Sequence, residues 1–366
     1  MITEPFTPRL TRQPGRLGRP DHVLGTDPRC DPRLLAALVT NGLDGLAADP
    51  AVTLDDTEQA RLEAVSADAQ RCEGLVARLA ADLPPVPGVA RTRTTVRGAA
   101  GHELELSVHR PDVVSSTLRP GVLHLHGGGM ALPGARGELE TRWRDELAAT
   151  GVVVIGVERP DATGARRRRH LADLSDSFDA LEWSHARRIT FGLSTLIVAG
   201  HSGGANLALA TTLRAKYAGR VGMIDGVYAI APCISGAYGW SDAQKFTHLP
   251  SLLENDGYVV NSARCAIVAS LDDPEGLHAH DPLRWPYWAT PADLAGLPPH
   301  VVSVNELDIF RDEGIAFYRN LARAGVRATC RNVMGTCHGA EIMFRRAMPD
   351  LYLSTVHDVH RFATGL

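Results

Sequence analysis

Aromatic residues are scarce in this chain, because Phe, Trp and Tyr make up only 5% of its 366 residues. An excess of basic charge is also missing, since 38 Lys and Arg face 42 Asp and Glu, for a formal net charge of −4. Such a balance argues against nucleic acid or an anionic membrane surface as the main partner. The composition instead favours a small, neutral partner.

Long hydrophobic runs and paired cysteines are absent as well. No apolar stretch is long enough to span a bilayer, and the N-terminal residues contain no apolar segment typical of a signal peptide. The six cysteines are scattered without the C-x-x-C spacing of a zinc site or the pattern of a disulfide framework. We therefore expect reduced thiols, a cytoplasmic protein with no membrane partner, and no bound metal.

The most informative segment that is present reads Gly200-His201-Ser202-Gly203-Gly204. An apolar run precedes it and predicts a strand, and small residues follow it at a spacing that predicts a helix. Glycines two before and two after a serine allow a turn so tight that the hydroxyl is exposed at the strand end. Ser202 is thus a candidate nucleophile, and an ordinary strand-to-helix turn is the alternative.

A second glycine motif, His126-Gly127-Gly128-Gly129, follows an apolar segment at 121–125 that predicts a buried strand. Bare backbone N–H groups in such a loop can hold the negative charge that develops on a substrate carbonyl. A phosphate-binding loop is the alternative, but neither G-x-G-x-x-G nor G-K-[ST] is present here. We expect His126 to brace this loop rather than to transfer protons.

A serine hydroxyl needs an imidazole to accept its proton and a carboxylate to orient that imidazole. Residues 301–305 predict a strand, and Asp308 lies just beyond its end, with Glu306 as its rival. Residues 328–333 predict a last strand, and His338 lies in the loop after it. The order Ser, Asp, His along the chain is that of α/β-hydrolases.

Other polar residues have simpler interpretations. The chain has fifteen histidines, so a structural role is the default for each one. His201 adjoins the candidate nucleophile, but a neighbour on such a turn points away from the hydroxyl, and we expect it to be structural. The run Arg166–Arg169 could bind an anionic group, yet such runs are usually a solvated face, and we predict the latter.

Together, these motifs resemble those of the hormone-sensitive-lipase family of α/β-hydrolases, over roughly residues 95 to 360. The segment Leu307 to Gly314 is similar to a family segment written D-P-L-R-D-E-G, whose first Asp is the acid of the catalytic triad. The resemblance therefore selects Asp308 over Glu306 and Asp312. His201 and Gly203 replace the Asp and Ala of the commonest family elbow, which brings the chain closer to the brefeldin A esterase branch.

The same resemblance assigns the oxyanion hole to the N–H groups of Gly128, Gly129 and Gly203. It implies a fold of the α/β class, with a mostly parallel eight-stranded sheet flanked by helices and covered by a helical cap. We expect an extended N-terminal arm and cap helices over 1–90, with apolar residues at helical spacing in Leu34 to Leu46 and in Ala60 to Leu83. A catalytic domain is expected over 91–366, with a cap insertion at about 235–290.

That insertion concentrates the few aromatic residues, which we expect to line the substrate pocket or to join the cap to the body: Tyr238, Trp240, Phe246, Tyr258, Trp285, Tyr287 and Trp288. The implied function is that of a serine carboxylesterase that hydrolyses small or short- to medium-chain esters without a cofactor. An acyltransferase or amidase on the same residues stays open, as does a non-catalytic small-molecule receptor, which the retained His338 disfavours. A small-molecule ester is the expected partner, and a homodimer is compatible with the fold.

Overall fold

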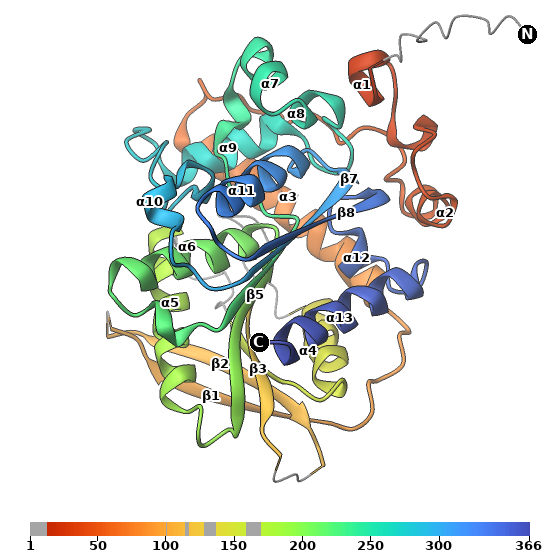
Figure 1. The fold of residues 1–366 in the computed structure, drawn as a ribbon. Helices are drawn as coiled ribbons and strands as arrows, with labels where there is room; N and C mark the ends of the chain where they lie inside the picture. The colour runs from red at the N-terminus through yellow and green to blue at the C-terminus, as the bar shows by residue number, and fades with distance from the viewer. Residues whose placement is uncertain (1–12, 100, 114–116, 128–136, 159–169) are drawn as a thin grey trace, which may run out of the picture.

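The computed structural model describes residues 13–99, 101–113, 117–127, 137–158 and 170–366, and one sheet forms its centre (Figure 1). Its strands are β1 (Val89–Arg97), β2 (Glu103–Pro111), β3 (Arg119–Leu125), β4 (Val153–Glu158), β5 (Leu193–His201), β6 (Gly226–Ile230), β7 (His300–Leu307) and β8 (Ala328–Cys337). The spatial order is β1-β2-β4-β3-β5-β6-β7-β8. β2 runs antiparallel to both of its neighbours, β1 and β4, and all the other neighbouring pairs are parallel. The prediction of a mostly parallel eight-stranded sheet is confirmed.

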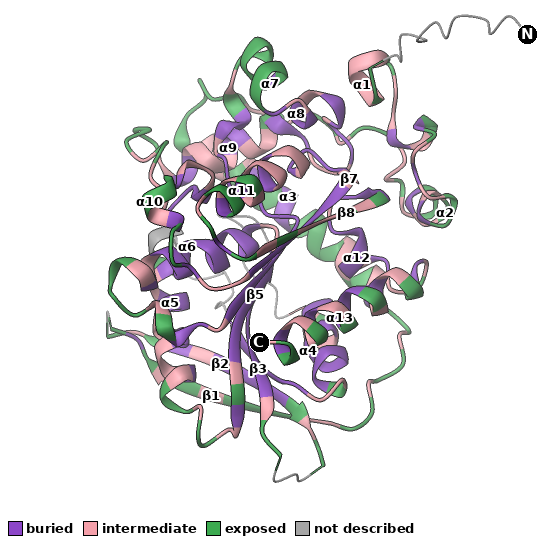
Figure 2. Cartoon of the chain, viewed as in Figure 1, coloured by how far each residue is buried: buried purple, intermediate pink, exposed green. Residues whose placement is uncertain are grey.

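Helices cover both faces of the sheet (Figure 1). One layer consists of α5 (His170–Ala186), α6 (Gly203–Tyr217) and α11 (Arg311–Arg323), and the other of α4 (Glu138–Ala149), α12 (Ala340–Met343) and α13 (Pro349–Thr364). Along β5, Leu196 and Val198 pack into the first layer, whereas Ile197 and Ala199 pack into the second. This alternation follows from the two-residue period of a strand. Both sides of the central strands are therefore buried (Figure 2).

A further group of helices lies beyond the edge of the sheet where β7 ends (Figure 1). It contains α3 (Glu58–Ala80), α7 (Asp242–His248), α8 (Ser251–Glu254) and α9 (Ser262–Asp272) with the short turns η3 (Ala237–Gly239) and η4 (Pro286–Trp288). The short helix α10 (Pro291–Leu294) lies instead against α6, where Nζ of Lys216 donates to the carbonyl oxygen of Asp293 at 2.8 Å. Val65 of α3 packs against Ile267 and Leu271 of α9. The segment before the sheet and the segment between β6 and β7 thus meet in one apolar cluster.

The N-terminal part, from residue 13, is folded rather than extended. It forms α1 (Gly15–Gly18), η1 (Leu24–Thr26) and α2 (Pro32–Asn41), and Leu24 and Leu34 are fully buried. The helix expected from Leu34 to Leu46 ends at Asn41, because Gly42 adopts φ 67° and the left-handed conformation that ends a helix. Among the described residues, no helix combines the length and apolarity needed to cross a bilayer.

Candidate active site

Ser202 lies in the turn between β5 and α6, with φ 53° and ψ −123°. Positive φ is rare for a residue other than glycine, because it costs on the order of 1–3 kcal/mol, and it persists only where the surrounding contacts enforce it. Here the Ser202 N–H donates to the carbonyl of Ile230 at 2.9 Å, and its carbonyl accepts from Ala205 N–H at 3.0 Å. These bonds hold the strained backbone between the end of β6 and the first turn of α6.

The glycines on either side of Ser202 are explained by the close approach of β3. A Cβ atom on Gly204 would collide with the backbone carbonyls of Leu125 and His126. One on Gly200 would collide with the backbone of Gly204 and Leu125. Because backbone atoms cannot move aside as a flexible side chain would, both positions require glycine. The tight turn predicted from the sequence is therefore also pressed against the neighbouring strand.

Ser202, Asp308 and His338 each follow directly after the last residue of a strand, namely β5, β7 and β8. The carboxyl ends of parallel strands lie at the same edge of a sheet, so these residues meet although they are far apart in sequence. Nε2 of His338 lies 3.0 Å from Oγ of Ser202, and Nδ1 lies 2.7 Å from Oδ2 of Asp308. The structure thus brings together the three residues selected from the sequence.

The Asp308 carboxylate is buried, and its second oxygen accepts the N–H of Phe310 at 3.0 Å. Burial by itself lowers the pKa of His338, because it disfavours the charged imidazolium. The negative charge of Asp308 and its hydrogen bond outweigh this effect, so the pKa of His338 is raised above its ordinary value. The imidazole is therefore a stronger proton acceptor than an isolated histidine.

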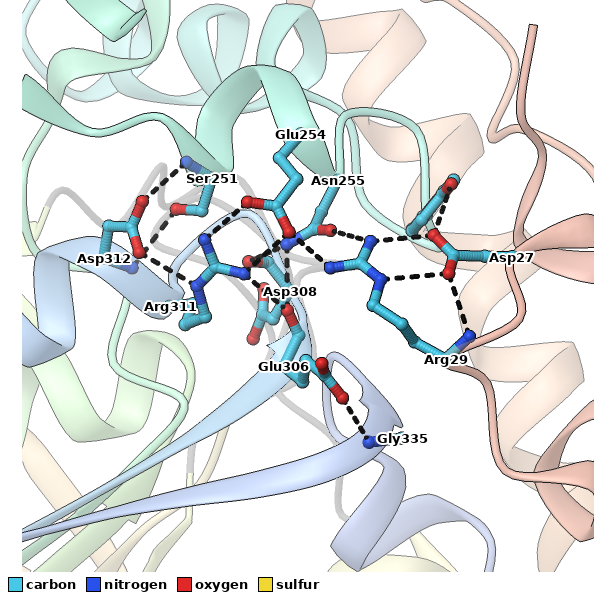
Figure 3. A network of polar contacts seen from close by, with 11 residues as sticks. Asp27, Arg29, Ser251, Glu254, Asn255, Glu306, Asp308, Arg311, Asp312 and Gly335 are labelled. Carbon is cyan, nitrogen blue, oxygen red and sulfur yellow. Dashed lines mark hydrogen bonds and ion pairs between the residues drawn. The ribbon is translucent and has the colours of Figure 1, made fainter. Parts of the chain in front are cut away.

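The two rival carboxylates have other partners. Oε2 of Glu306 accepts the N–H of Gly335 at 2.8 Å and so joins β7 to β8. Oδ2 of Asp312 accepts the N–H of Ser251 at 2.7 Å, and its Oδ1 accepts from Arg311 at 2.9 Å. Both carboxylates therefore hold neighbouring elements, as Figure 3 shows.

The predicted oxyanion donors are described only in part. Gly203 is the first residue of α6, a position whose N–H has no acceptor within the helix. Gly128 and Gly129 lie outside the described residues, as does the run Arg166–Arg169. At the start of the glycine motif, Nδ1 of His126 lies 2.6 Å from the Gly127 carbonyl oxygen, a contact consistent with the bracing role expected for this histidine.

His201 points away from the hydroxyl of Ser202, toward Glu140. Its Nε2 lies 3.2 Å from Oε1 of Glu140, and its ring fills the space where a Cβ on Gly127 would stand. His201, Glu140 and His124 bring potential metal-ligand atoms within 4.8 Å of one another. However, Nε of Arg144 donates to Nδ1 of His124 at 3.3 Å, which leaves the proton of a neutral ring on Nε2. That proton and the guanidinium charge both oppose a cation, so the cluster fits a structural role.

The aromatic residues of the segment between β6 and β7 mainly contact each other. Tyr238 packs edge-on against Trp285 and Phe310, with ring centroids 5.9 and 5.5 Å apart, and Phe310 in turn lies edge-on to His338 at 5.0 Å. Phe246, by contrast, is 53% exposed. The rings therefore join this segment to Phe310, in the loop that carries Asp308, and through it to the base His338.

The buried carboxyl of Glu313 was not predicted from the sequence, although it lies in the segment that identified Asp308. Glu313 accepts the N–H of Ile234 at 2.6 Å and the hydroxyl of Tyr238 at 3.1 Å, and it contacts Ser235 Oγ. Burial raises its pKa to about 8, although these hydrogen bonds lower it. The motif marked the residue, but nothing local in the sequence indicated that its partners follow β6.

A strained serine at the carboxyl edge of a mostly parallel sheet, with a histidine and an aspartate beside it, defines an α/β-hydrolase type of site. In agreement, the profile of a family described as alpha/beta hydrolase fold matches residues 122–342, more than half of the chain. The chain belongs to this α/β-hydrolase family, in the branch that contains hormone-sensitive lipase.

Among solved structures, the chain is similar to brefeldin A esterase, described as a bacterial homologue of human hormone-sensitive lipase. That likeness has 44% identity and a TM-score of 0.92, over 96% of this chain and 98% of the other. Esterase Est22 is 34% identical with a TM-score of 0.81, over 94% and 100% of the two chains.

Two curated relatives come from Mycobacterium tuberculosis, and each is 27% identical to this chain. The match to esterase LipI spans 60% of this chain and 65% of the relative, and the match to carboxylesterase NlhH spans 65% and 71%. These matches are partial, whereas the likeness to the solved esterases extends over nearly the whole chain.

Proposed function

We propose that the protein is a serine carboxylesterase that hydrolyses small or short- to medium-chain carboxylic esters through an acyl-enzyme intermediate. The observation that carries the proposal is the continuous hydrogen-bonded series from Ser202 Oγ through His338 to the buried Asp308. The four relatives described above support it, because each is named an esterase or a carboxylesterase.

In the proposed mechanism, Oγ of Ser202 attacks the ester carbonyl carbon while Nε2 of His338 takes the hydroxyl proton. Asp308 orients the imidazole through Nδ1 and stabilises the imidazolium that forms. His338 then gives its proton to the departing alcohol oxygen as the ester C–O bond breaks, which leaves Ser202 acylated. Water, activated by the same imidazole, releases the acid and restores the hydroxyl. No step of this chemistry calls for a metal or an organic cofactor.

The oxyanion of each tetrahedral intermediate would be held by the N–H groups of Gly128, Gly129 and Gly203. The support for Gly203 is its place directly after the nucleophile at the start of α6, where N–H groups and the helix dipole favour negative charge. Removal of one such donor typically costs about 100-fold or more in kcat.

We further propose that residues 1–90 and about 235–290 supply a cap over a catalytic domain formed by residues 91–366. The apolar contact of α3 with α9 supports a joint cap, since these helices come from the two proposed cap segments. A capped site suits a small-molecule ester. The cytoplasmic location and the homodimer stay predictions.

The function is tested with p-nitrophenyl esters from acetate to palmitate, by comparison of the wild type with Ser202→Ala. We expect turnover of the short-chain esters by the wild type, and a decrease of about 10⁴-fold or more in kcat for Ser202→Ala with an unchanged circular dichroism spectrum. Turnover retained by Ser202→Ala would show that another group is the nucleophile.

The alternative functions predict other results in the same assay. An acyltransferase would yield mainly the transferred ester when an alcohol acceptor is added, and an amidase would cleave the matching p-nitroanilide. A receptor would bind ester without turnover, which the contact between His338 and Ser202 disfavours.

A further inference from the structure

Charged side chains of alternating sign join the N-terminal segment, α8 and the loop that carries Asp308 (Figure 3). We call this set, together with one buried amide, the acid-loop network: Asp27, Arg29, Glu254, Asn255, Arg311 and Asp312. Its members come from three places far apart in the sequence, so only the folded chain brings them together. Only a few polar contacts then separate the N-terminal segment from the backbone of Asp308.

Arg29 forms the N-terminal end of the acid-loop network. Its guanidinium makes two bonds to the carboxylate of Asp27, at 2.9 and 2.7 Å, and an ion pair with Glu254. One of its nitrogens also lies 3.3 Å from Oδ1 of Asn255. The planar guanidinium thereby fixes both the carboxylate and the amide at the end of α8.

Glu254 connects this end to the acid loop. Both of its oxygens pair with Arg311, at 2.9 and 2.7 Å, in the two-point geometry that arginine and carboxylate favour. Arg311 also donates to the carbonyl oxygen of Glu306 at 3.0 Å. The ion pair thus contacts the backbone two residues before Asp308.

Asn255 makes the most direct contact with the acid loop. Its amide nitrogen donates to the carbonyl oxygens of Glu306 and of Asp308 itself, each at 3.0 Å, so both of its N–H groups are used. The side chain is fully buried, and its oxygen faces Arg29. Asn255 therefore holds the backbone of Asp308, while Arg29 fixes the orientation of the amide.

The network is charged despite its burial, since only 3% of the Glu254 side chain is exposed. Burial raises the pKa of Glu254, but the combined effect of Arg311 and Arg29 is larger and opposite. The pKa of Glu254 therefore lies below the ordinary value of a glutamate. Loss of one arginine would leave a buried carboxylate without its counter-charge, which is costly. The charged members of the network thus depend on one another.

From these contacts we infer that Asn255, oriented by Arg29, is a positioning residue for Asp308, so that the N-terminal segment takes part in the alignment of the catalytic acid. The inference rests on the proposed function. Asp308 must meet Nδ1 of His338 to hold the ring toward Ser202, and a shift of about 1 Å in such a group can cost about 100-fold in rate. Asn255 and Arg29 lie far from Asp308 in the sequence. Asn255 acts on Asp308 through the backbone carbonyl of that residue, and Arg29 acts through Asn255.

The first experiment compares Asn255→Leu and Arg29→Met with a matched control, Arg33→Met. Arg33 lies four residues from Arg29 but is half exposed and pairs with Asp31 and Asp350 at 3.0 and 2.7 Å, away from the acid loop. With p-nitrophenyl butyrate we expect kcat to fall about 10- to 100-fold for Asn255→Leu at a KM within about twofold. The kcat of Arg29→Met should fall less than that of Asn255→Leu, and Arg29→Lys should recover part of this loss. The kcat of Arg33→Met should match that of the wild type.

The pH profile separates positioning from a general loss of structure. If Asp308 is displaced, His338 loses the carboxylate that raises its pKa, and the acid limb of kcat/KM moves to lower pH in Asn255→Leu. Thermal unfolding at the assay pH shows whether each variant is folded. If Asn255→Leu is unfolded, the pH profiles of Arg29→Met and Arg29→Lys are compared instead. The inference then predicts that the acid limb of kcat/KM moves to lower pH in Arg29→Met and moves less in Arg29→Lys.

The decisive step is a double-mutant cycle with Asp308→Asn. If Asn255 acts through Asp308, Asn255→Leu lowers kcat in the wild type but changes it less than about twofold in the Asp308→Asn background. An equal loss in both backgrounds would show that Asn255 acts independently of Asp308 and would overturn the inference. A wild type without turnover would instead defeat the proposed function, and a normal Asn255→Leu enzyme would defeat the positioning role alone.

Discussion

The nucleophile and the acid of the site are held in place in different ways. Ser202 is positioned through its backbone, by a strained conformation, a hydrogen bond to the end of β6 and two glycines that let β3 approach. Asp308 is positioned by a side chain from far away in the chain, that of Asn255, and by the nearby Arg311, which the ion pair with Glu254 holds in turn. The turn formed by Gly200, Ser202 and Gly204 tolerates almost no substitution at these positions, whereas a side-chain network distributes the positioning of Asp308 over several residues.

The largest effect should come from a substitution in the turn that carries Ser202. Gly204→Val places a side chain against the carbonyls of Leu125 and His126, so we expect loss of turnover and a decrease of about 3 kcal/mol or more in the free energy of unfolding. Gly222→Ala is the matched control, because a Cβ at Gly222 meets no atom within 4 Å. Urea unfolding and ester turnover measure both. An active, stable Gly204→Val would refute the close-approach explanation.

The second largest effect should come from substitution of the catalytic acid, Asp308. Asp308→Asn keeps the size of the side chain but lets the amide stabilise the wrong tautomer of His338, so kcat should fall about 10⁴-fold. The substitution should leave KM for p-nitrophenyl acetate within a few-fold. If Asp308→Asn retains most of the activity while Glu306→Gln or Asp312→Asn loses it, the acid has been assigned to the wrong carboxylate.

The acid-loop network should show its strength in the pH dependence of stability. Burial raises the pKa of Asp27, but Arg29 lowers it by more. The pKa of Asp27 therefore lies below its ordinary value of 3.8, as the pKa of Glu254 lies below its ordinary value of 4.5. A depressed carboxylate pKa stabilises the fold above the unfolded pKa, and this contribution is lost as the pH falls through the folded pKa.

Arg29→Met should therefore cost about 2–4 kcal/mol at pH 7, and this difference from the wild type should shrink as the pH falls below about 4. Urea unfolding from pH 3 to 7 measures the difference, with Arg33→Met as the control. A difference that is constant across this range would show that Arg29 contributes by packing and not by charge.

The smallest effect concerns Glu313, where the sign is reversed. Its pKa is raised to about 8 by burial, so its contribution to stability is fully present below the unfolded value of 4.5 and declines as the pH rises toward 8. Glu313→Gln cannot ionise, so the wild type should lose roughly 1 kcal/mol or more relative to this variant between pH 5 and 8. Parallel unfolding curves over that range would contradict a neutral, buried Glu313.

The comparison of the two regions also explains what the sequence could predict. The turn around Ser202 and the glycine motif are contiguous patterns, and each of the three residues at the strand ends follows its own predicted strand, so each could be recognised from its sequence neighbours. The roles of Asn255 and Arg29 could not be predicted, since their partners lie in segments that no local pattern connects.

The helix boundaries show the same limit on a smaller scale. Apolar periodicity extended the helix to Leu46, but the left-handed Gly42 ends it at Asn41. In the last strand, the pattern ended at 333, yet β8 continues to Cys337, with a register irregularity near its end where Leu307 pairs with Cys337. This extension places His338 directly after the strand and therefore beside Asp308.

The most direct test of the account is to label the wild type with a fluorophosphonate probe and to locate the adduct by mass spectrometry. The proposed mechanism predicts a single adduct on Ser202, formed in parallel with the loss of p-nitrophenyl ester hydrolysis and absent in Ser202→Ala. An adduct on another residue, or hydrolysis that continues after Ser202 is fully labelled, would contradict the assignment of Ser202 as the nucleophile.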